Sequence, residues 1–253
     1  MTRMLIDPVS GWTPQQVTSP ASMLEPYVAL PIDPSTLAYW RLDAYGGAAW
    51  VDRVGGLTMT TLSGNAVIEN ALVGYHCVGA LESAKLEEDV HPLWLRGDLT
   101  LEAIASTRTT YTFNLIDLGS GTLPLSVPYL LRLTSTTAHT APSFGWAQSS
   151  SVMYELASAT PLPIDARPRY IAATRSGGVA RIYVDGVLVA EDLAAPVVPR
   201  TGYDRALRLS GSLVGGEGVL YTAAISSRAF APAEITERYN AGPAKLGQFI
   251  TRQ

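Results

Sequence analysis

The sequence is poor in cysteine and contains no long apolar run. Cys77 is the only cysteine among 253 residues, so no disulfide bridge can form within the chain. No stretch approaches the about 20 apolar residues of a membrane span, and the first twenty residues hold no apolar core of signal-peptide length. We therefore expect no disulfide framework, no membrane span, and synthesis in the cytoplasm without export by the usual route.

Charged residues are also scarce. They make up 16% of the chain, against the about 25% of an average protein. The formal net charge is −4, and the longest run of like charge is Glu87-Glu88-Asp89. Nucleic-acid binding needs a basic stripe or patch that neutralises phosphates, so we expect no nucleic-acid partner.

The residue patterns that carry common catalytic chemistry are missing as well. The histidines His76, His91 and His139 do not stand at any zinc-binding spacing. The chain has no Gly-x-Ser-x-Gly nucleophile turn and no phosphate-binding glycine loop. We therefore expect no catalytic residue and no resident cofactor.

Proline is abundant in the first 35 residues, which contain six prolines. Because proline fixes φ and removes a backbone donor, this pattern predicts an extended arm over residues 1–35. An arm without its own core becomes ordered by lying on a surface. We expect that surface to belong to another protein chain; the alternative, that the arm covers its own domain, stays open. The apolar anchors of the arm are Leu5, Ile6, Trp12, Met23, Leu24, Tyr27 and Val28, and Trp12 is the strongest because aromatic residues dominate binding hot spots.

Short alternating segments rich in β-branched residues, tyrosine and leucine follow the arm. The clearest signal is Asp185-Gly186 between two β-branched runs, which predicts a hairpin with a type I′ turn. Many short strands at this spacing predict an all-β fold, a two-sheet antiparallel jelly-roll sandwich. The expected strands cover residues 37–42, 57–62, 66–69, 99–106, 111–118, 125–134, 152–157, 170–174, 179–184, 187–191, 206–210 and 219–226.

One short helix is expected near the C-terminus, over residues 232–240. Pro232 suits the first helical position, and Glu234 stands where a carboxylate reaches the open backbone donors. Gly242 is a plausible stop. The sequence therefore divides into an arm (1–35), one domain (36–241) and a tail (242–253).

Several blocks of this domain follow a known pattern in the right order. They are Ala38-Tyr39-Trp40-Arg41-Leu42-Asp43, Val51-Asp52-Arg53-Val54-Gly55, Gly97-Asp98-Leu99-Thr100-Leu101-Glu102-Ala103, residues 170–186, and Ala229-Phe230-Ala231-Pro232-Ala233-Glu234-Ile235. These blocks resemble the laminin-G-like / concanavalin A-like lectin-glucanase jelly-roll superfamily in its bacterial and phage form, and the resemblance covers about residues 36–241. It departs from the family pattern at Leu99, where an aromatic is usual, at Tyr170, where tryptophan is common, and at Ala231, where serine is usual.

The resemblance implies a fold that hosts lectins, glycosidases and structural modules alike. The Glu-x-Asp-x-Glu strand of its retaining glucanases is absent, which argues against an enzyme. Domains of this kind often bind Ca²⁺ at a loop rim; Asp43, Asp52 and Asp117 are the calcium candidates, although Asp52 is expected to brace a turn. Sugars stack on exposed aromatic rings, so the candidate glycan contacts are the aromatics in Gly- or Pro-flanked stretches: Tyr45, Trp50, Trp146 and Tyr203.

These features favour a non-enzymatic structural and interaction protein. We expect a tailed-phage virion component, on tail or head, that displays the jelly roll, binds other virion proteins through residues 1–35 and so belongs to an oligomeric assembly. The expected location is the virion. The low charge and positive mean hydropathy of +0.15 suggest an exterior partly covered by partners. Contact with host surface glycan is compatible with this interpretation. The alternative is a carbohydrate-binding lectin module outside a virion.

Overall fold

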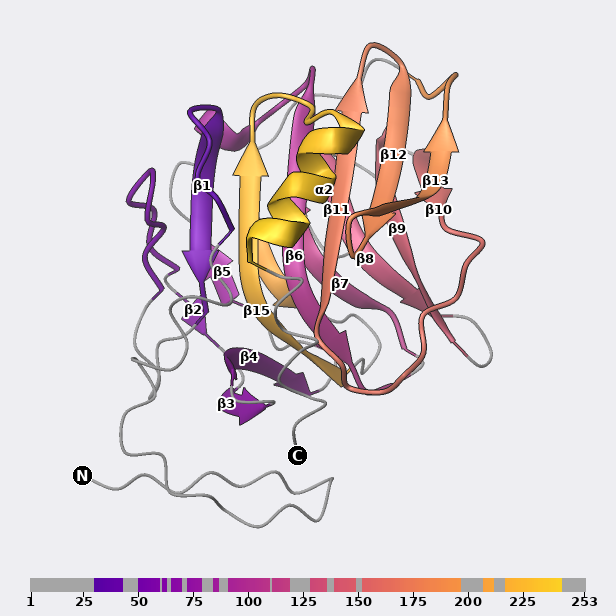
Figure 1. Ribbon diagram of the computed structural model, residues 1–253. Coiled ribbons are helices and arrows are strands. Elements are labelled where there is room, and N and C mark those ends of the chain that lie inside the picture. The colour runs from indigo at the N-terminus through magenta and orange to yellow at the C-terminus, as the bar shows by residue number, and fades with distance from the viewer. Residues whose placement is uncertain are drawn as a thin grey trace, which may run out of the picture.

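A computed structural model gives the fold of the chain (Figure 1). It describes residues 30–42, 50–59, 61–62, 65–69, 72–78, 84–86, 91–109, 111–118, 128–135, 139–148, 152–196, 207–211 and 217–242. The apolar anchors expected in the arm, from Leu5 to Val28, lie outside these residues. Among the described helices, none is long and apolar enough to cross a membrane.

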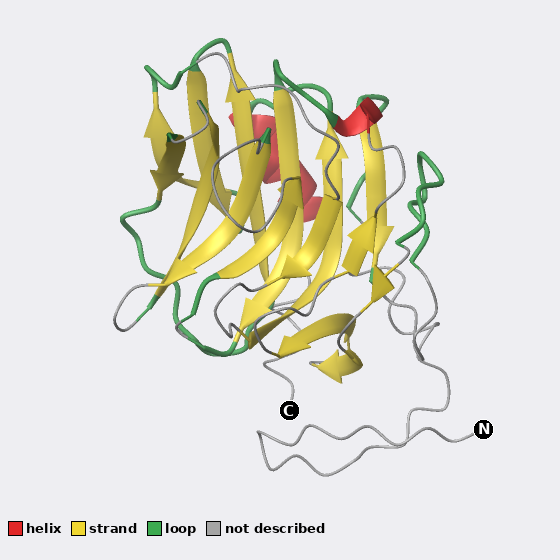
Figure 2. Ribbon diagram, turned by 180° about the vertical axis from the view of Figure 1, so that it is seen from behind, coloured by secondary structure: helices red, strands yellow, loops and turns green. Residues whose placement is uncertain are grey.

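Two antiparallel sheets face each other (Figures 1 and 2). The first has eight strands in the order β13-β12-β11-β6-β15-β4-β3, with β1 also pairing with β15, and the second has seven in the order β10-β9-β8-β7-β14-β5-β2. The strands of the first sheet are β1 (Thr36–Arg41), β3 (Asn65–Glu69), β4 (Leu72–Val78), β6 (Leu99–Thr107), β11 (Arg169–Ser176), β12 (Val179–Val184), β13 (Val187–Asp192) and β15 (Glu217–Ser226). Those of the second are β2 (Thr61–Leu62), β5 (Ala84–Leu86), β7 (Phe113–Leu118), β8 (Tyr129–Ser135), β9 (Thr140–Ala147), β10 (Met153–Ala157) and β14 (Leu207–Gly211). The predicted two-sheet antiparallel sandwich is confirmed.

The main core lies between the sheets. Alternate residues of each strand point to the same face, and in β6 these are Leu99, Leu101, Ala103 and Ala105, which all belong to this core. A short 3₁₀ turn, η1 (His91–Leu93), precedes β6 and adds Leu93. The largest fully buried side chains of the core are Trp40, Trp146, Tyr129, Phe113 and Phe144.

In the described part of the chain one α-helix, α2 (Pro232–Ala241), covers the outer face of the first sheet (Figure 1). Glu234 accepts a hydrogen bond from the backbone N–H of Ala231 at 2.7 Å, so the expected half of a capping box is present. Ile235 is fully buried beneath the helix, which stabilises the fold by about 2 kcal/mol. The cluster under and beside the helix comprises Leu30, Tyr39, Ile104, Tyr170, Ala172, Tyr183, Val219, Tyr221, Ala224, Phe230 and Ile235.

The hairpin between β12 and β13 has the predicted turn. Asp185 and Gly186 have φ of 48° and 78°, as a type I′ turn requires at both central positions. Asp185 also accepts a hydrogen bond from the backbone N–H of Tyr170 at 2.9 Å, which ties the turn to β11.

Three observed strands were not expected from the sequence: β4, β5 and β9. The segment of β9 contains Pro142 and Gly145, which disfavour a strand in a local analysis. Pro142 is tolerated because it lies just past the last β9–β10 ladder pair, Ser143 opposite Ala157. It has no N–H to donate, but its carbonyl still accepts a hydrogen bond from the N–H of Ser158 at 3.0 Å. At Gly145 the neighbouring backbone is so close that an added Cβ would lie 2.4 Å from the carbonyl oxygen of Tyr154.

Candidate functional site

Residues 30–35, at the base of the expected arm, are bound to the folded domain; we call them the arm root. Leu30 is buried, and its backbone N–H donates a hydrogen bond to the Tyr39 hydroxyl at 3.3 Å. The carbonyl of Ser35 accepts a hydrogen bond from the backbone N–H of Ser227 at 2.9 Å. The described chain is therefore in contact with the domain from its first residue, Leu30, six residues before β1 begins.

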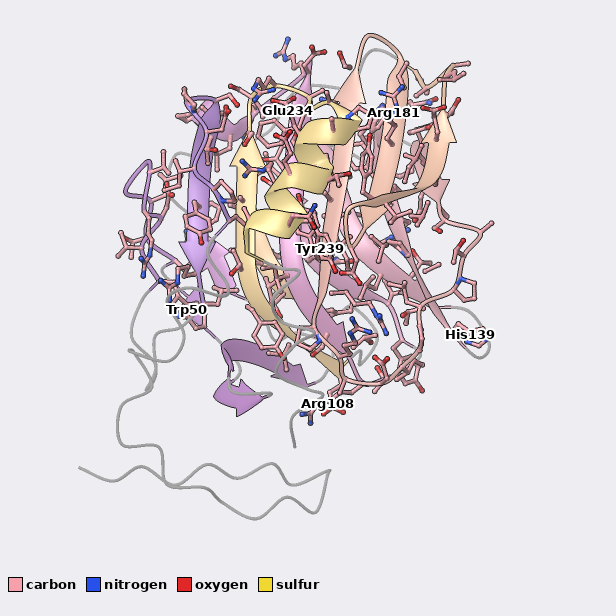
Figure 3. All side chains as sticks on the ribbon, in the orientation of Figure 1. Trp50, Arg108, His139, Arg181, Glu234 and Tyr239 are labelled. Carbon is pink, nitrogen blue, oxygen red and sulfur yellow. The ribbon has the colours of Figure 1, made fainter. Side chains whose placement is uncertain are left out.

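An arginine joins the arm root to the start of helix α2. Arg228 donates from Nε and Nη2 to Asp33 at 3.3 and 2.8 Å, and from Nη1 and Nη2 to Glu234 at 3.0 and 2.7 Å. Its guanidinium also lies over the ring of Phe230, 4.4 Å from the centroid. We call Asp33, Arg228 and Glu234 the root clamp; Figure 3 labels Glu234 at the helix start.

The charges of the root clamp are mutually stabilised. Hydrogen bonds from Arg228, and then from Ser35, hold the pKa of Asp33 well below its usual range. The Arg228 hydrogen bonds likewise lower the pKa of Glu234. The same contacts raise the pKa of Arg228 above its ordinary value. The clamp therefore stays fully ionised at physiological pH, and it fixes the arm root against the start of helix α2.

Asp52, a calcium candidate, braces a turn. Its carboxylate accepts hydrogen bonds from the backbone N–H groups of Tyr39, Val54 and Gly55 at 2.6, 2.9 and 2.6 Å. The N–H of Arg53 in turn donates to the carbonyl of Tyr39 at 2.8 Å. The turn thus lies along the edge of β1 that β15 leaves free, and the carboxylate is occupied by backbone donors.

Asp117, the second calcium candidate, lies on β7 and points away from the inter-sheet core. Its carboxylate accepts one hydrogen bond, from Asn114 Nδ2 at 3.3 Å. Burial raises the pKa of Asp117 to about 6, against the opposing charges of Arg208 and Arg132. Asp52 lies in the turn beside β1 of the first sheet, whereas Asp117 lies on β7 of the second sheet. Asp43 lies outside the described residues. Within the described part of the chain, no group of three or more His, Cys, Asp or Glu could hold a metal ion.

The structure places two of the candidate glycan contacts in the core. Trp50 is 3% and Trp146 0% exposed, and both belong to the inter-sheet cluster, so no sugar can stack on their rings. The ring of Trp146 instead packs against Tyr154, 4.4 Å between centroids, and under the Arg175 guanidinium at 4.8 Å. Tyr45 and Tyr203 lie outside the described residues.

Arg175 is a buried cation that holds the loop before β6. It donates to the carbonyls of Gly97, Leu95 and Pro128 at 3.0, 3.0 and 3.2 Å. Burial lowers its pKa to about 10. All three of these hydrogen bonds go to backbone carbonyls, and they fix one rim of the sandwich.

A second buried charge lies under helix α2. Arg238 donates from Nε and Nη2 to the carboxylate of Glu102 at 2.8 and 2.6 Å, and the Tyr170 hydroxyl donates to the same carboxylate at 2.6 Å. Glu102 is fully buried. Burial, and then the Glu102 charge, raise the pKa of Tyr170 well above its usual value. This network locks the helix to β6 and β11.

The outer face of the second sheet carries polar side chains from adjacent strands; we call it the polar face. Arg132 donates from Nε and Nη2 to Glu155 at 3.0 and 2.6 Å, and Thr134 and Ser143 share a hydrogen bond of 2.6 Å beside them. These cross-strand groups offer both donors and acceptors on a sheet surface. The residues of the polar face are Asn114, Asp117, Arg132, Thr134, Ser143, Glu155 and Arg208.

Sequence reasoning did not find the root clamp, the Glu102–Arg238 pair or the polar face. The partners of each ion pair come from distant parts of the chain, and only Glu234, at the third position of the helix, had a local signal. In β8 and β10, polar and apolar residues alternate with a period of two, and Arg132 and Glu155 are among the polar ones. This alternation is the pattern that could have indicated the polar face.

Comparison with known proteins identifies the architecture. The binding domain of botulinum neurotoxin serotype C1 matches with a TM-score of 0.62 and 8% identity, over 82% of this chain and 52% of that one. The binding domain of botulinum neurotoxin DC, solved in complex with rat synaptotagmin II, matches with a TM-score of 0.62 and 10% identity, over 83% and 52%. This chain shares their fold. No family model and no curated protein sequence matches.

A third match describes a botulinum neurotoxin type C whose cell entry depends on two ganglioside molecules; its TM-score is 0.60 at 9% identity, over 82% of this chain and 51% of that one. The chain therefore spans about half the length of the binding domains it matches. At such low identity the likeness concerns the β-sandwich architecture.

Proposed function

We propose that this chain is a non-catalytic interaction protein of a virion, a tail or head component of a tailed phage. In this proposal the sandwich is the displayed module, of laminin-G-like or concanavalin A-like type, and the proline-rich arm binds a neighbouring virion protein. The chain is then one part of an oligomeric assembly.

The observation that carries the proposal is the root clamp. Arg228 ties Asp33 to Glu234 through four hydrogen bonds, so the arm root is held at a fixed point on the domain. A fixed root reduces the conformational entropy that an arm loses when it binds a partner. An arm that served only as a loose terminus would need no such attachment.

The composition supports an exterior partly covered by partners. Only 16% of residues are charged and the mean hydropathy is +0.15, whereas isolated soluble domains usually rely on a more charged surface. A proline-rich segment cannot satisfy its backbone in a regular ladder of its own, which favours contact with a second chain.

Deletion of residues 2–29 tests the proposal, because it removes the arm and keeps the arm root. We expect the truncated protein to unfold at nearly the same temperature as the full chain, and to be missing from particles purified from cells that produce the virus. Mass spectrometry of those particles measures incorporation. Equal incorporation of the two forms would refute the arm's role, and early melting or aggregation of the truncated form would show that the arm covers its own domain.

A matched variant separates the clamp from the arm. Arg228→Gln leaves residues 1–29 intact but removes the charge that holds Asp33 and Glu234. We expect reduced incorporation with little loss of thermal stability, because the pair is partly exposed and exposed ion pairs contribute at most about 1 kcal/mol.

Glycan binding by the displayed sandwich is the second candidate function. It is favoured by the shared fold with toxin binding domains that were solved with sialylT or described as depending on gangliosides. The polar face supplies arginine, carboxylate, amide and hydroxyl groups suited to sugar hydroxyls. Titration with sialylated oligosaccharides, followed by calorimetry, tests it; a signal that survives Arg132→Ala would place any such binding elsewhere.

A further inference from the structure

Strand β13 forms an open edge of the first sheet. Among the described residues, no strand pairs with the side of β13 that faces away from β12. Alternate residues of an edge strand direct their backbone N–H and C=O groups outward, so the edge is a template for another extended chain. The strand, VLVAED, contains no lysine and no proline, which are the residues that commonly protect such an edge.

The β13 edge is also unusually apolar for an exposed strand. Val187 is 65% and Leu188 43% exposed, and Leu193, directly after the strand, is 69% exposed. The corresponding edge of β1 differs, because the turn at Asp52 lies along it and bonds to Tyr39. The free edge of β1 is therefore covered by a turn of the same chain, while the described residues leave the edge of β13 open.

A β-bulge sets which side chains of β13 share a face. The bulge lies opposite Ile182 and Tyr183, and it brings Leu188 opposite Tyr183 and Glu191 opposite Arg181. Directly opposed residues point to the same face, and Glu191 indeed accepts a hydrogen bond from Arg181 Nε at 2.5 Å; Figure 3 labels Arg181 near the top of this edge. Leu188 and Glu191 thus both lie on the outer face, an apolar position followed by an acidic one.

One segment of the arm has the complementary pattern. Residues 2–7, TRMLID, form the run that ends at Pro8, and Arg3 is the only basic residue among residues 1–35. If residues 2–7 are laid antiparallel to β13, and one of them is placed opposite both residues of the bulge, Leu5 lies opposite Leu188. Arg3 then falls opposite Glu191. Leu5 and Arg3 are two residues apart and so share a face of an extended strand, as Leu188 and Glu191 do.

We propose that residues 2–7 of a second copy of this chain add to β13 as a further antiparallel strand of the first sheet. This inference rests on the proposed function, in which the arm leaves its own domain, and names the surface on which the arm docks. Backbone hydrogen bonds supply affinity, while the Leu5–Leu188 and Arg3–Glu191 pairs set the register. Helix α2 lies on the outer face between β1, which follows the arm root, and β13 (Figure 1), and in this proposal the donor is a neighbouring copy.

Cysteine cross-linking between two differently marked molecules tests the proposal. Isotopically labelled Leu5→Cys protein is mixed with unlabelled Leu188→Cys protein, oxidised, and the disulfides are mapped by mass spectrometry. We expect a 5–188 disulfide that joins labelled to unlabelled chains. The matched control is Met4→Cys with the same partner, because residue 4 points to the opposite face; it should cross-link far less. No 5–188 disulfide, or equal yields at positions 4 and 5, would overturn the proposal.

A double variant carrying both Leu5→Cys and Leu188→Cys separates a neighbour's arm from the chain's own arm. With labelled and unlabelled copies mixed before oxidation, cross-links between copies support the proposal. Cross-links confined to single chains would overturn it in favour of an arm that covers its own edge.

Sedimentation velocity supplies an independent readout of self-association. We expect the full chain to associate, deletion of residues 2–7 to abolish association, and Leu188→Lys to weaken it about tenfold, which corresponds to about 1.4 kcal/mol. Arg3→Glu should weaken association about threefold. A full chain that remains monomeric at high concentration would overturn the inference.

The outcomes also separate this inference from the proposed function. If deletion of residues 2–29 prevents particle incorporation while Leu188→Lys leaves both self-association and incorporation unchanged, the arm docks elsewhere and only the β13 surface is refuted. If the deletion has no effect on incorporation, the proposed function fails as well.

Discussion

Removing Arg238 should destabilise the protein strongly, because its partner is buried beneath helix α2. Glu102 is fully buried and accepts two hydrogen bonds from Arg238, at 2.8 and 2.6 Å. In Arg238→Met the aliphatic stem is kept, but the carboxylate loses its counter-charge in a site that water does not reach. Breaking a buried pair in this way costs about 3–5 kcal/mol. The helix is the element we expect to loosen first.

Urea denaturation followed by tryptophan fluorescence measures this loss. The double variant Glu102→Gln with Arg238→Met removes both charges, while the amide keeps a hydrogen-bond partner in the Tyr170 hydroxyl. We expect it to recover at least half of the lost stability, about 2 kcal/mol. The matched control is Arg181→Met, which breaks the partly exposed pair with Glu191 and should cost less than about 1 kcal/mol. If Arg238→Met cost no more than this control, the reasoning would be refuted.

Three further changes follow from buried contacts. Because the pKa of Asp117 is raised from 3.8 to about 6, its contribution to stability falls as pH rises from about 4 to about 6, by at most about 3 kcal/mol; Asp117→Asn should remove that slope in denaturation curves recorded at pH 4 and 7. Gly145→Ala should push β10 away from β9 and lower the free energy of unfolding by about 2 kcal/mol. Hydrogen exchange of the β10 amides should then be faster than in the wild type, while exchange in β6 changes less; unchanged exchange in β10 would contradict this. Asp52→Ala leaves three backbone donors without their acceptor and should lower the melting temperature by several degrees, about 2–3 kcal/mol; a calorimetric melt equal to wild type would argue that the turn does not brace β1.

Local chemistry explains which parts of the fold the sequence predicts. The hairpin of β12 and β13 was recoverable because Asp185 and Gly186 meet the conformational demand of its turn by themselves. Helix α2 was recoverable because Pro232 and Glu234 suit its first turn. In both cases the deciding interactions lie within a few residues of the signal.

Tertiary contacts decide the rest. Trp146 stands near Pro142 and Gly145, which suggested an exposed loop, yet β9 is held as a strand by pairing with β8 and β10 and turns this ring into the core. The Glu102–Arg238 pair joins residues 136 positions apart, and no local pattern marks either of them. Candidate sites chosen from flanking residues alone therefore missed the buried charges.

The attachment of the arm root gives the chain a mechanical property. A pull on residues before Leu30 is carried first by Arg228 and then, along the strand axis, by β1. This strand is held beside β15 by a ladder running from Thr36, opposite Ser226, to Arg41, opposite Thr222. Since the ladder bonds lie across the direction of such a pull, they share the load and must break together, not one after another. The sandwich is therefore fastened to the arm root by a joint that resists tension along the strand axis.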